Sequence, residues 1–259
     1  MRYILSLLIY LVLTNYCFSS GLLSHKASYN LTLERKNNNS LLEGGAGKST
    51  FIFKKTCSGW SLKENFMITY NLANKKSAKS YSVFKTFEDF LSKKFSFEHN
   101  DKSEISGEIN YSGFIKKNDK ILSGKLIEKD INDISYEGNI LLPTEHLIKL
   151  INFAKEEKNF FHSDVFFGSS KKNLIKSVTA FIGQKKPSLE NNKYKSLKKN
   201  VWPIKLAFYN YQQKKATPET EISLEIDEEG VVHYYLVDYG DYNMVGKLDK
   251  IKVFKQKKC

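Results

Sequence analysis

The chain is poor in arginine, proline and cysteine, and the shortage of arginine bears directly on possible partners. Arg2 and Arg35 are its two arginines among 41 basic residues. It therefore lacks the planar, bidentate side chains that phosphate and guanine recognition usually recruit. We expect no dedicated nucleic-acid binding, although the formal net charge is +13. The lysines create a diffuse positive surface, which leaves contact with anionic phospholipid headgroups open.

Long apolar runs are also absent, except at the N-terminus. Arg2 is followed by an apolar run from Tyr3 to Leu13 and then by small and polar residues, which is the layout of a secretory signal peptide. We predict a signal peptide over residues 1–19, with cleavage after Ser19 or Gly21. Residues 20–259 are then one exported, periplasmic domain without a transmembrane span. Losing Arg2 leaves 40 basic and 28 acidic residues, a net charge of +12.

Three cysteines are present, and one of them, Cys17, lies in the predicted signal peptide. Lipidation of Cys17 is disfavoured because Tyr16 precedes it, where lipoprotein signals need a small residue. Cys57 and Cys259 remain in the exported protein, where disulfides can form, and we predict a disulfide bond between them. Unpaired thiols or an intermolecular link are the alternatives. A bond would bring the two Cα atoms to about 5–6 Å, with the last strand beside an early one.

The stretch GGAGKST at residues 44–50 is similar to a phosphate-binding loop, but its context predicts a strand. A Walker loop needs a glycine five positions before Gly47, and Leu42 is there. The following residues, FIFKK, alternate in the manner of a strand instead of opening a helix. We therefore predict no nucleotide site.

Most of the remaining chain alternates between apolar and polar residues with a period of two, and short turns separate these segments. This pattern is typical of an antiparallel sandwich or barrel. The sequence ISLEI-DEEG-VVHYYLV predicts a hairpin with Gly230 in a left-handed position, and YGDYNMVGKLDKI predicts the next one. The segments with this alternation are HKASYNLTLER, KSTFIFKK, SYSVFKTF, KKFSFEH, SEISGEINYSGFI, EISLEI and VVHYYLVDYG.

One helix is predicted over LPTEHLIKLINFAKEE, which begins at Leu142. Thr144 is the candidate N-cap, and one face carries Leu147, Ile148, Ile151 and Ala154. We expect this helix to plug or cover the sheet. Residues 184–200 are polar and basic without periodicity, which indicates a loop of unassigned role.

Catalytic and metal motifs are weak. The five histidines are His25, His99, His146, His162 and His233, and no pair has a metal-binding spacing. His146 could meet His162, but a histidine hydrogen-bonded at a helix end is the simpler interpretation, and His233 is expected to be structural. We predict no metal, no cofactor and no enzyme activity. The carboxylates that could hydrolyse a glycosidic bond are instead expected on the solvent face or in turns; they are Glu219, Glu221, Glu225, Asp227, Asp238 and Asp241.

Aromatic residues make up 14% of the chain, and many lie on candidate strands and turns. If the curved sheet encloses a cavity, such side chains would suit an acyl chain or a peptide. If the interior is filled, they form the core, which is the preferred interpretation. The candidate ligand or core residues are Trp60, Trp202, Tyr209, Tyr211, Tyr235 and Tyr239.

Several short motifs in order resemble a known family. They are HKASYNLTL, TCSGW, FEDF followed by FSFEH, LPTEHLIKLINFA, WPIKLAFYNY and LVDYGDYNMVGKLDKIKVFKQKKC. Together they are similar to the EipB, or cell-envelope integrity, family of alphaproteobacterial periplasmic proteins. The resemblance covers residues 25–259. Two departures, Ser58 before Gly59 and the FFGS stretch at 166–169, weaken any claim that these turns bind a ligand.

The resemblance implies an all-β fold: a long antiparallel sheet wound into a spiral or broken barrel, with one amphipathic helix packed on or in it. It also implies a disulfide between an early strand and the C-terminus, and Cys57 and Cys259 match the family's two cysteines. The expected role is non-catalytic support of the envelope, by a monomer that binds a partner protein or an envelope component such as lipid or peptidoglycan. A carrier of an apolar or lipid ligand is the alternative, and a secreted carbohydrate-active hydrolase is the third reading.

Overall fold

The computed structural model describes residues 21–35, 41–73, 76–90, 93–188, 197, 200–213, 216–255 and 259. The predicted signal peptide at residues 1–19 and Cys17 lie outside these residues. Most of the 184–200 loop also lies outside them, although its described part includes a short strand at Lys186–Pro187. Ser188, which follows that strand, is buried.

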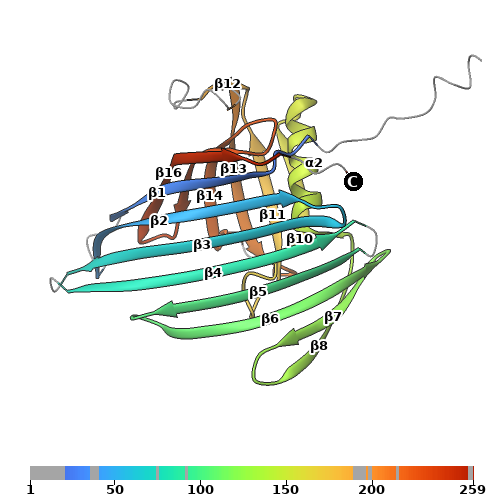
Figure 1. Ribbon diagram of the computed structural model, residues 1–259, viewed down its shortest axis with the longest axis horizontal. Helices are drawn as coiled ribbons and strands as arrows, with labels where there is room; N and C mark the ends of the chain where they lie inside the picture. The colour runs from blue at the N-terminus through green and yellow to red at the C-terminus, as the bar shows by residue number, and fades with distance from the viewer. Residues whose placement is uncertain are drawn as a thin grey trace, which may run out of the picture.

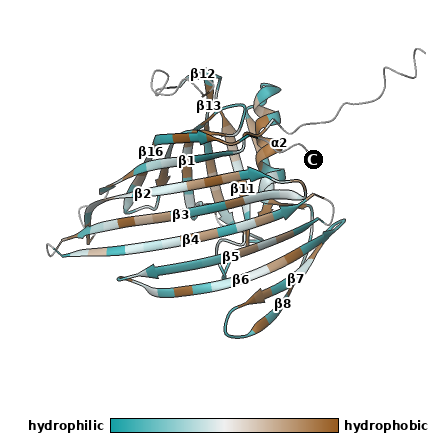
Figure 2. Cartoon of the chain, viewed as in Figure 1, coloured by the Kyte–Doolittle hydropathy of each residue, from teal (hydrophilic) through white to brown (hydrophobic). Residues whose placement is uncertain are grey.

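The first half of the chain forms an antiparallel meander in which each strand pairs with the next. Figure 1 shows these long strands lying side by side, and Figure 2 shows hydrophobic and hydrophilic residues alternating along them. This alternation gives the sheet one buried face, because successive side chains of a strand point to opposite sides. The strands are β1 (His25–Arg35), β2 (Leu42–Lys55), β3 (Gly59–Leu72), β4 (Ser77–Asp89), β5 (Lys94–Ser103), β6 (Gly107–Asn118), β7 (Ile121–Ile127) and β8 (Ile131–Glu137).

The second half returns to the first strand. The last strand, Tyr242–Val253, pairs antiparallel with β1, so the first and last strands lie in the middle of the sheet. This half contains β9 (Ile140–Leu141), α2 (Pro143–Lys155), β10 (Phe160–Phe166), β11 (Ile175–Ile182), β12 (Lys186–Pro187), β13 (Asn200–Asn210), β14 (Thr220–Ile226), β15 (Val232–Asp238) and β16 (Tyr242–Val253).

The sheet curls into a nearly closed barrel whose two edge strands, β8 and β9, are consecutive in the chain. The predicted all-β broken barrel is confirmed. Side chains close the seam between its edges. Phe97 of β5 contacts Phe166 of β10, with ring centroids 5.8 Å apart. Phe97 also fills the space beside Gly113 and Gly168, where an added Cβ would lie 2.5 Å and 2.8 Å from its ring.

The glycine-rich stretch that resembles a phosphate loop lies entirely within β2. Gly45 and Gly47 pair with Tyr70 and Ile68 of β3. A Cβ at Gly47 would lie 2.2 Å from the carbonyl oxygen of Met67, so these glycines allow close strand contact. The strand prediction is confirmed.

Turn predictions succeeded at two hairpins and failed at one. Gly230 and Gly240 adopt φ values of +81° and +87° in the β14–β15 and β15–β16 connections. By contrast, SEISGEINYSGFI was predicted as one strand, but β5 ends at Ser103 and β6 begins at Gly107. The serine hydroxyl of Ser103 accepts hydrogen bonds from the N–H groups of Ile105 and Ser106, which turns the chain.

Helix α2 packs against β10 and the neighbouring end of the barrel. The prediction of Thr144 as N-cap is wrong, because Leu142 is the cap. Pro143 suits the first helical position, and the N–H of Thr144 donates to the Glu88 carboxylate at 2.9 Å. Of the predicted face, Ile151 and Ala154 are buried and Leu147 and Ile148 are half-buried; Leu150 is buried as well.

Candidate ligand-binding interior

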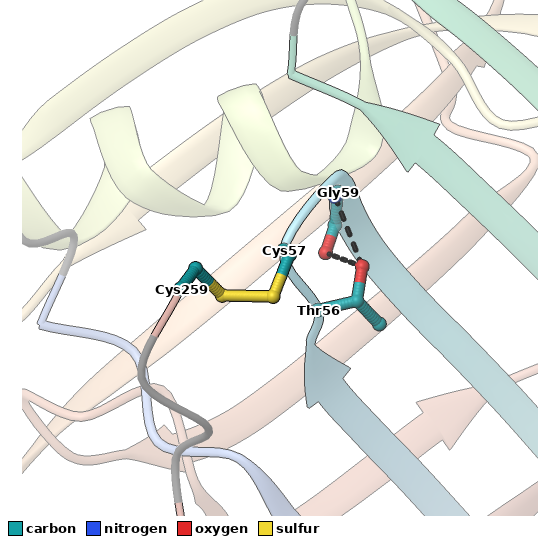
Figure 3. Close-up of a disulfide and its surroundings, with 4 residues drawn as sticks. All are labelled: Thr56, Cys57, Gly59 and Cys259. Carbon is teal, nitrogen blue, oxygen red and sulfur yellow. Dashed lines mark hydrogen bonds between the residues drawn. A yellow bond between two sulfur atoms is a disulfide. The ribbon is translucent and has the colours of Figure 1, made fainter.

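The disulfide joins Cys57 to Cys259 across 202 residues, with Cα atoms 5.5 Å apart. Cys57 lies in the turn between β2 and β3, as Figure 3 shows. Thr56 fixes this turn: its hydroxyl donates to the Gly59 carbonyl at 2.9 Å and accepts from the Gly59 N–H at 3.0 Å. The predicted pairing is therefore present, and it ties the C-terminal segment to an early turn.

The two tryptophans among the predicted aromatics are core residues. Trp60 and Trp202 are 3% and 5% exposed and belong to one buried cluster. Trp60 stacks on Phe53 with centroids 4.6 Å apart and planes 6° from parallel. Leu150 and Ile151 of α2 belong to the same cluster, which we call the helix-end cluster.

The four predicted tyrosines lie in different places. Tyr235 points into the barrel, where its ring covers Gly246 and its hydroxyl is 3.2 Å from that of Ser49. Tyr211 lies at the seam and donates to the Glu137 carbonyl at 3.1 Å. Tyr209 is half-buried. Tyr239 is 46% exposed in a turn, so the core reading is wrong for it. The six residues do not form one site.

Three buried clusters line the inner face of the sheet. Besides the helix-end cluster, the seam cluster is built around Phe97, Ile115 and Phe166. The terminal-strand cluster is built around Leu31 and Ile68. Phe51 and Ile222 pack against both the helix-end and the terminal-strand cluster, which shows that these two clusters lie on adjoining parts of the interior.

Between the clusters, inward-pointing side chains remain partly accessible to solvent. Strand register sets their direction, because residues directly opposite each other in an antiparallel pair share one face. Phe53 and Phe97 are buried on the inner face, and alternate residues of the same strands point the same way. The half-buried residues of this kind are Phe51, Leu62, Glu64, Phe66, Phe84 and His99 from the first half of the chain, and Phe208, Ile222, Leu224 and Tyr235 from the second. We call them the interior wall.

Glu64 is the acidic member of the interior wall, and its position was missed in the sequence. It pairs with Phe51 on one side and Phe84 on the other. Burial raises the pKa of its carboxyl group. Burial also raises the pKa of Tyr235 to about 12, and the Glu64 charge adds to that rise. The alternation of β3 could have revealed Glu64, because it shares the parity of Trp60 and Ile68.

A chain of hydrogen bonds crosses strands β4, β5 and β6 on the inner face, with Phe84 between His99 and Glu64. His99 Nε2 is 3.0 Å from the Ser82 hydroxyl, and His99 Nδ1 is 2.8 Å from the Tyr111 hydroxyl. Asp101 pairs with Ser82 across the strands, and its Oδ1 atom is buried without a hydrogen-bond partner. Burial lowers the pKa of His99, which favours the neutral imidazole, although the Asp101 charge opposes this effect.

A second polar group, also missed in the sequence, is completely enclosed. His233 lies 2.9 Å from the Ser188 hydroxyl and 3.1 Å from the Asp227 carboxylate. These are the residue types of a hydrolytic triad, but Ser188, His233 and Asp227 are only 4%, 2% and 0% exposed. Asp227 Oδ1 also accepts from the N–H groups of Glu229 and Val231. The arrangement therefore fixes the β14–β15 hairpin, and the structural role expected for His233 agrees with it.

His146 and His162 lie in different environments. Burial lowers the pKa of His146 to about 4. Its Nε2 atom is buried without a hydrogen-bond partner, so the helix-end hydrogen bond predicted for it is not made by this atom. Its ring stacks on Phe161, 5.6 Å away. His162 is exposed, with its Nδ1 atom 3.0 Å from the Thr179 hydroxyl.

Two of the carboxylates predicted on the solvent face are buried. Glu225 is 5% exposed and pairs with Lys186 at 2.7 Å. Asp227 accepts the turn hydrogen bonds given above. Glu225 is covered on the outer face by Lys186 of β12, and Asp227 is enclosed by its contacts with His233 and with the N–H groups of the β14–β15 turn. By contrast, Glu219 is exposed and Glu221 half-buried, and they pair with Lys176 and Lys205.

The described part of the chain contains neither a metal-binding cluster nor a membrane-spanning helix. Within residues 21–35, 41–73, 76–90, 93–188, 197, 200–213, 216–255 and 259, no group of three histidine, cysteine or acidic residues could hold a metal ion. None of the helices formed by these residues is long and apolar enough to cross a membrane.

Comparison with known proteins identifies the family. A sequence model described as EipB-like matches residues 19–255. The chain belongs to the EipB-like family. It is 26% identical over 241 residues to the cell envelope integrity protein EipB of Brucella abortus, covering 90% of this chain and 85% of that protein.

A solved structure of the same shape supports this family membership. The crystal structure of a beta-barrel-like protein of domain of unknown function DUF1849 from Brucella abortus matches with a TM-score of 0.83 and 25% identity. The match covers 90% of this chain and 99% of that structure. The family resemblance found in the sequence is confirmed.

Proposed function

We propose that this protein supports the integrity of the cell envelope by holding an amphipathic envelope molecule inside its broken barrel, without catalysis. The name of the Brucella relative, cell envelope integrity protein, supports the cellular role. The interior wall supports the binding mode, because its half-buried, inward-pointing side chains offer apolar surface inside the barrel that a ligand could cover. Apolar residues with a few polar groups are the usual composition of a small-molecule site.

Export to the periplasm is part of the proposal. It rests on Arg2 and on the apolar run from Tyr3 to Leu13. Mass spectrometry of the protein from cells should find a mature N-terminus within residues 18–25. An intact Met1, or a lipid on Cys17, would contradict export as a soluble protein.

A non-catalytic role is the simplest account of the polar groups. The buried Ser188, His233 and Asp227 have the residue types of a hydrolase, but their low exposure leaves the serine hydroxyl little access to a substrate. A serine-directed fluorophosphonate probe tests this point. We expect no labelling of Ser188 in the folded protein, and stoichiometric labelling would revive the hydrolase alternative.

Binding to a protein partner is the second candidate. Phe160 and Phe181 form an aromatic pair on the outer surface of β10 and β11, with centroids 5.6 Å apart and exposures of 51% and 54%. Exposed aromatic side chains are frequent anchors in protein interfaces. This observation favours a partner that contacts the outside of the barrel and leaves the interior free.

Titration with decyl maltoside below its micelle concentration tests the proposed function. We expect saturable binding of one molecule per chain, measured by calorimetry. Leu224→Gln, on the interior wall, should weaken it, whereas Phe181→Gln, on the outer surface, should not. Circular dichroism should confirm that both variants fold. Absence of binding to the wild type would overturn the carrier proposal, and loss only in Phe181→Gln would favour the outer surface.

A further inference from the structure

Glu64 is a carboxylate in aromatic surroundings on the interior wall. Phe51 and Phe84 lie directly opposite it on the neighbouring strands, where Cβ atoms are about 4.5–5.5 Å apart. Phe66 follows on the same face of β3, and all three rings are half-buried. Tyr235 is close enough for the Glu64 charge to act on its hydroxyl.

The lysines nearest to Glu64 in the sheet do not neutralise it. Lys63 precedes Glu64 in the chain and Lys85 follows Phe84, so both lysines point to the outer face. There, Lys85 pairs with Glu98 at 3.1 Å. Within the described part of the chain, no donor hydrogen-bonds to the Glu64 carboxylate and no cation pairs with it. A carboxylate in such a place is costly unless a positive group accompanies it.

A second acceptor lies on the same inner face, two strands away from Glu64. Asp101 Oδ1 is buried without a partner, and Asp101 pairs with Ser82, which in turn pairs with Phe66. Two acidic side chains therefore face the interior of a protein whose net charge is strongly positive. In this interior a cation would meet both the Glu64 carboxylate and aromatic ring faces. Ring faces attract cations electrostatically.

We propose that the interior binds an amphipathic molecule with a cationic ammonium group, which pairs with Glu64 and contacts the rings of Phe51, Phe66 and Phe84 while its alkyl chain follows the apolar wall. This inference rests on the proposed function and specifies the chemistry of the ligand. An anionic headgroup would meet the Glu64 and Asp101 charges and is therefore disfavoured.

Three probes with the same decyl chain and different headgroups test the inference: decyltrimethylammonium, decyl maltoside and decanoate. Each is titrated calorimetrically into the full mature protein below its micelle concentration. We expect decyltrimethylammonium to bind about tenfold more tightly than decyl maltoside, and decanoate to bind more weakly than either. Glu64→Gln keeps the size of the side chain and removes its charge, so it should abolish the preference for decyltrimethylammonium over decyl maltoside.

Glu34→Gln is the matched control, because Glu34 is exposed on the outer face of β1. It should retain the tenfold preference. Equal binding of the cationic and neutral probes by the wild type would overturn the headgroup inference but leave the carrier proposal standing. A preference that persists in Glu64→Gln would overturn the assignment to Glu64. If no probe binds, both the inference and the proposed function are wrong.

Discussion

Closure of the seam by Phe97 predicts that Gly168→Ala is strongly destabilising. Gly168 has φ +66°, and an added Cβ would lie 2.8 Å from Phe97 Cγ. Phe97 is 3% exposed, and Gly113 bounds its ring on the other side, so the ring has no space to move away. The left-handed backbone costs an alanine about 1 kcal/mol, and overpacking of this kind costs about 1–3 kcal/mol more. The expected total is about 2–4 kcal/mol.

Gly240→Ala separates these two contributions. Gly240 has φ +87°, but nothing lies within 4 Å of an added Cβ, so this variant carries only the backbone cost. Urea unfolding followed by circular dichroism should show a loss of about 1 kcal/mol for Gly240→Ala and about 1–3 kcal/mol more for Gly168→Ala. Equal losses in the two variants would refute the claim that Phe97 packed beside Gly168 closes the seam.

Three further predictions concern the disulfide and two buried polar groups. Cys57→Ser should lower the free energy of unfolding by up to about 5 kcal/mol under oxidising conditions, because a loop of 202 residues is released; an unchanged melting temperature of the wild type after verified reduction would contradict this. Burial lowers the pKa of His146 from 6.5 to about 4. As the pH drops, His146 therefore takes up a proton in the unfolded chain before it does so in the folded protein, and the free energy of unfolding falls between about pH 6.5 and 4. Urea titrations at each pH should show that His146→Phe removes about 3 kcal/mol of this loss. If the wild type and the variant have the same pH profile, His146 is not the cause of the loss. Asp227→Asn should cost about 1–3 kcal/mol by the same assay, whereas Asp241→Asn, in an exposed turn, should cost less than about 0.5 kcal/mol; equal losses would show that the buried pairing is unimportant.

The alternating pattern was sufficient to predict the sheet, because a strand that is half-buried must alternate. It was not sufficient to find Ser103 as the end of β5, since SEISGEI continues to alternate through the turn. The Thr144 cap was predicted from residue type alone. Leu142 caps instead because Pro143 already has helical geometry and Glu88, distant in the sequence, accepts the Thr144 N–H.

Residue type predicted the site less well than the fold. The sequence identified Trp60 and Trp202 as candidate ligand or core residues. Which of the two roles they have depends on the side chains packed opposite them, and these are set only when the barrel closes. Glu64 has no local motif; the alternation of β3 places it on the same face as Trp60 and Ile68, and the pairing with Phe51 and Phe84 shows which rings lie opposite it. Asp227 is buried against His233, which also contacts Ser188 of the distant β12 segment, and no short pattern encodes that contact.

Crystallography with an alkyl ligand brominated at the end of its chain tests the central claim that the interior accepts an apolar chain. A neutral maltoside headgroup keeps this test independent of Glu64. The account predicts one anomalous bromine peak inside the barrel, between Leu62 and Phe66 on one side and Ile222 and Leu224 on the other. A bromine peak confined to the outer surface at Phe160 and Phe181, or no peak at saturating ligand, would contradict it.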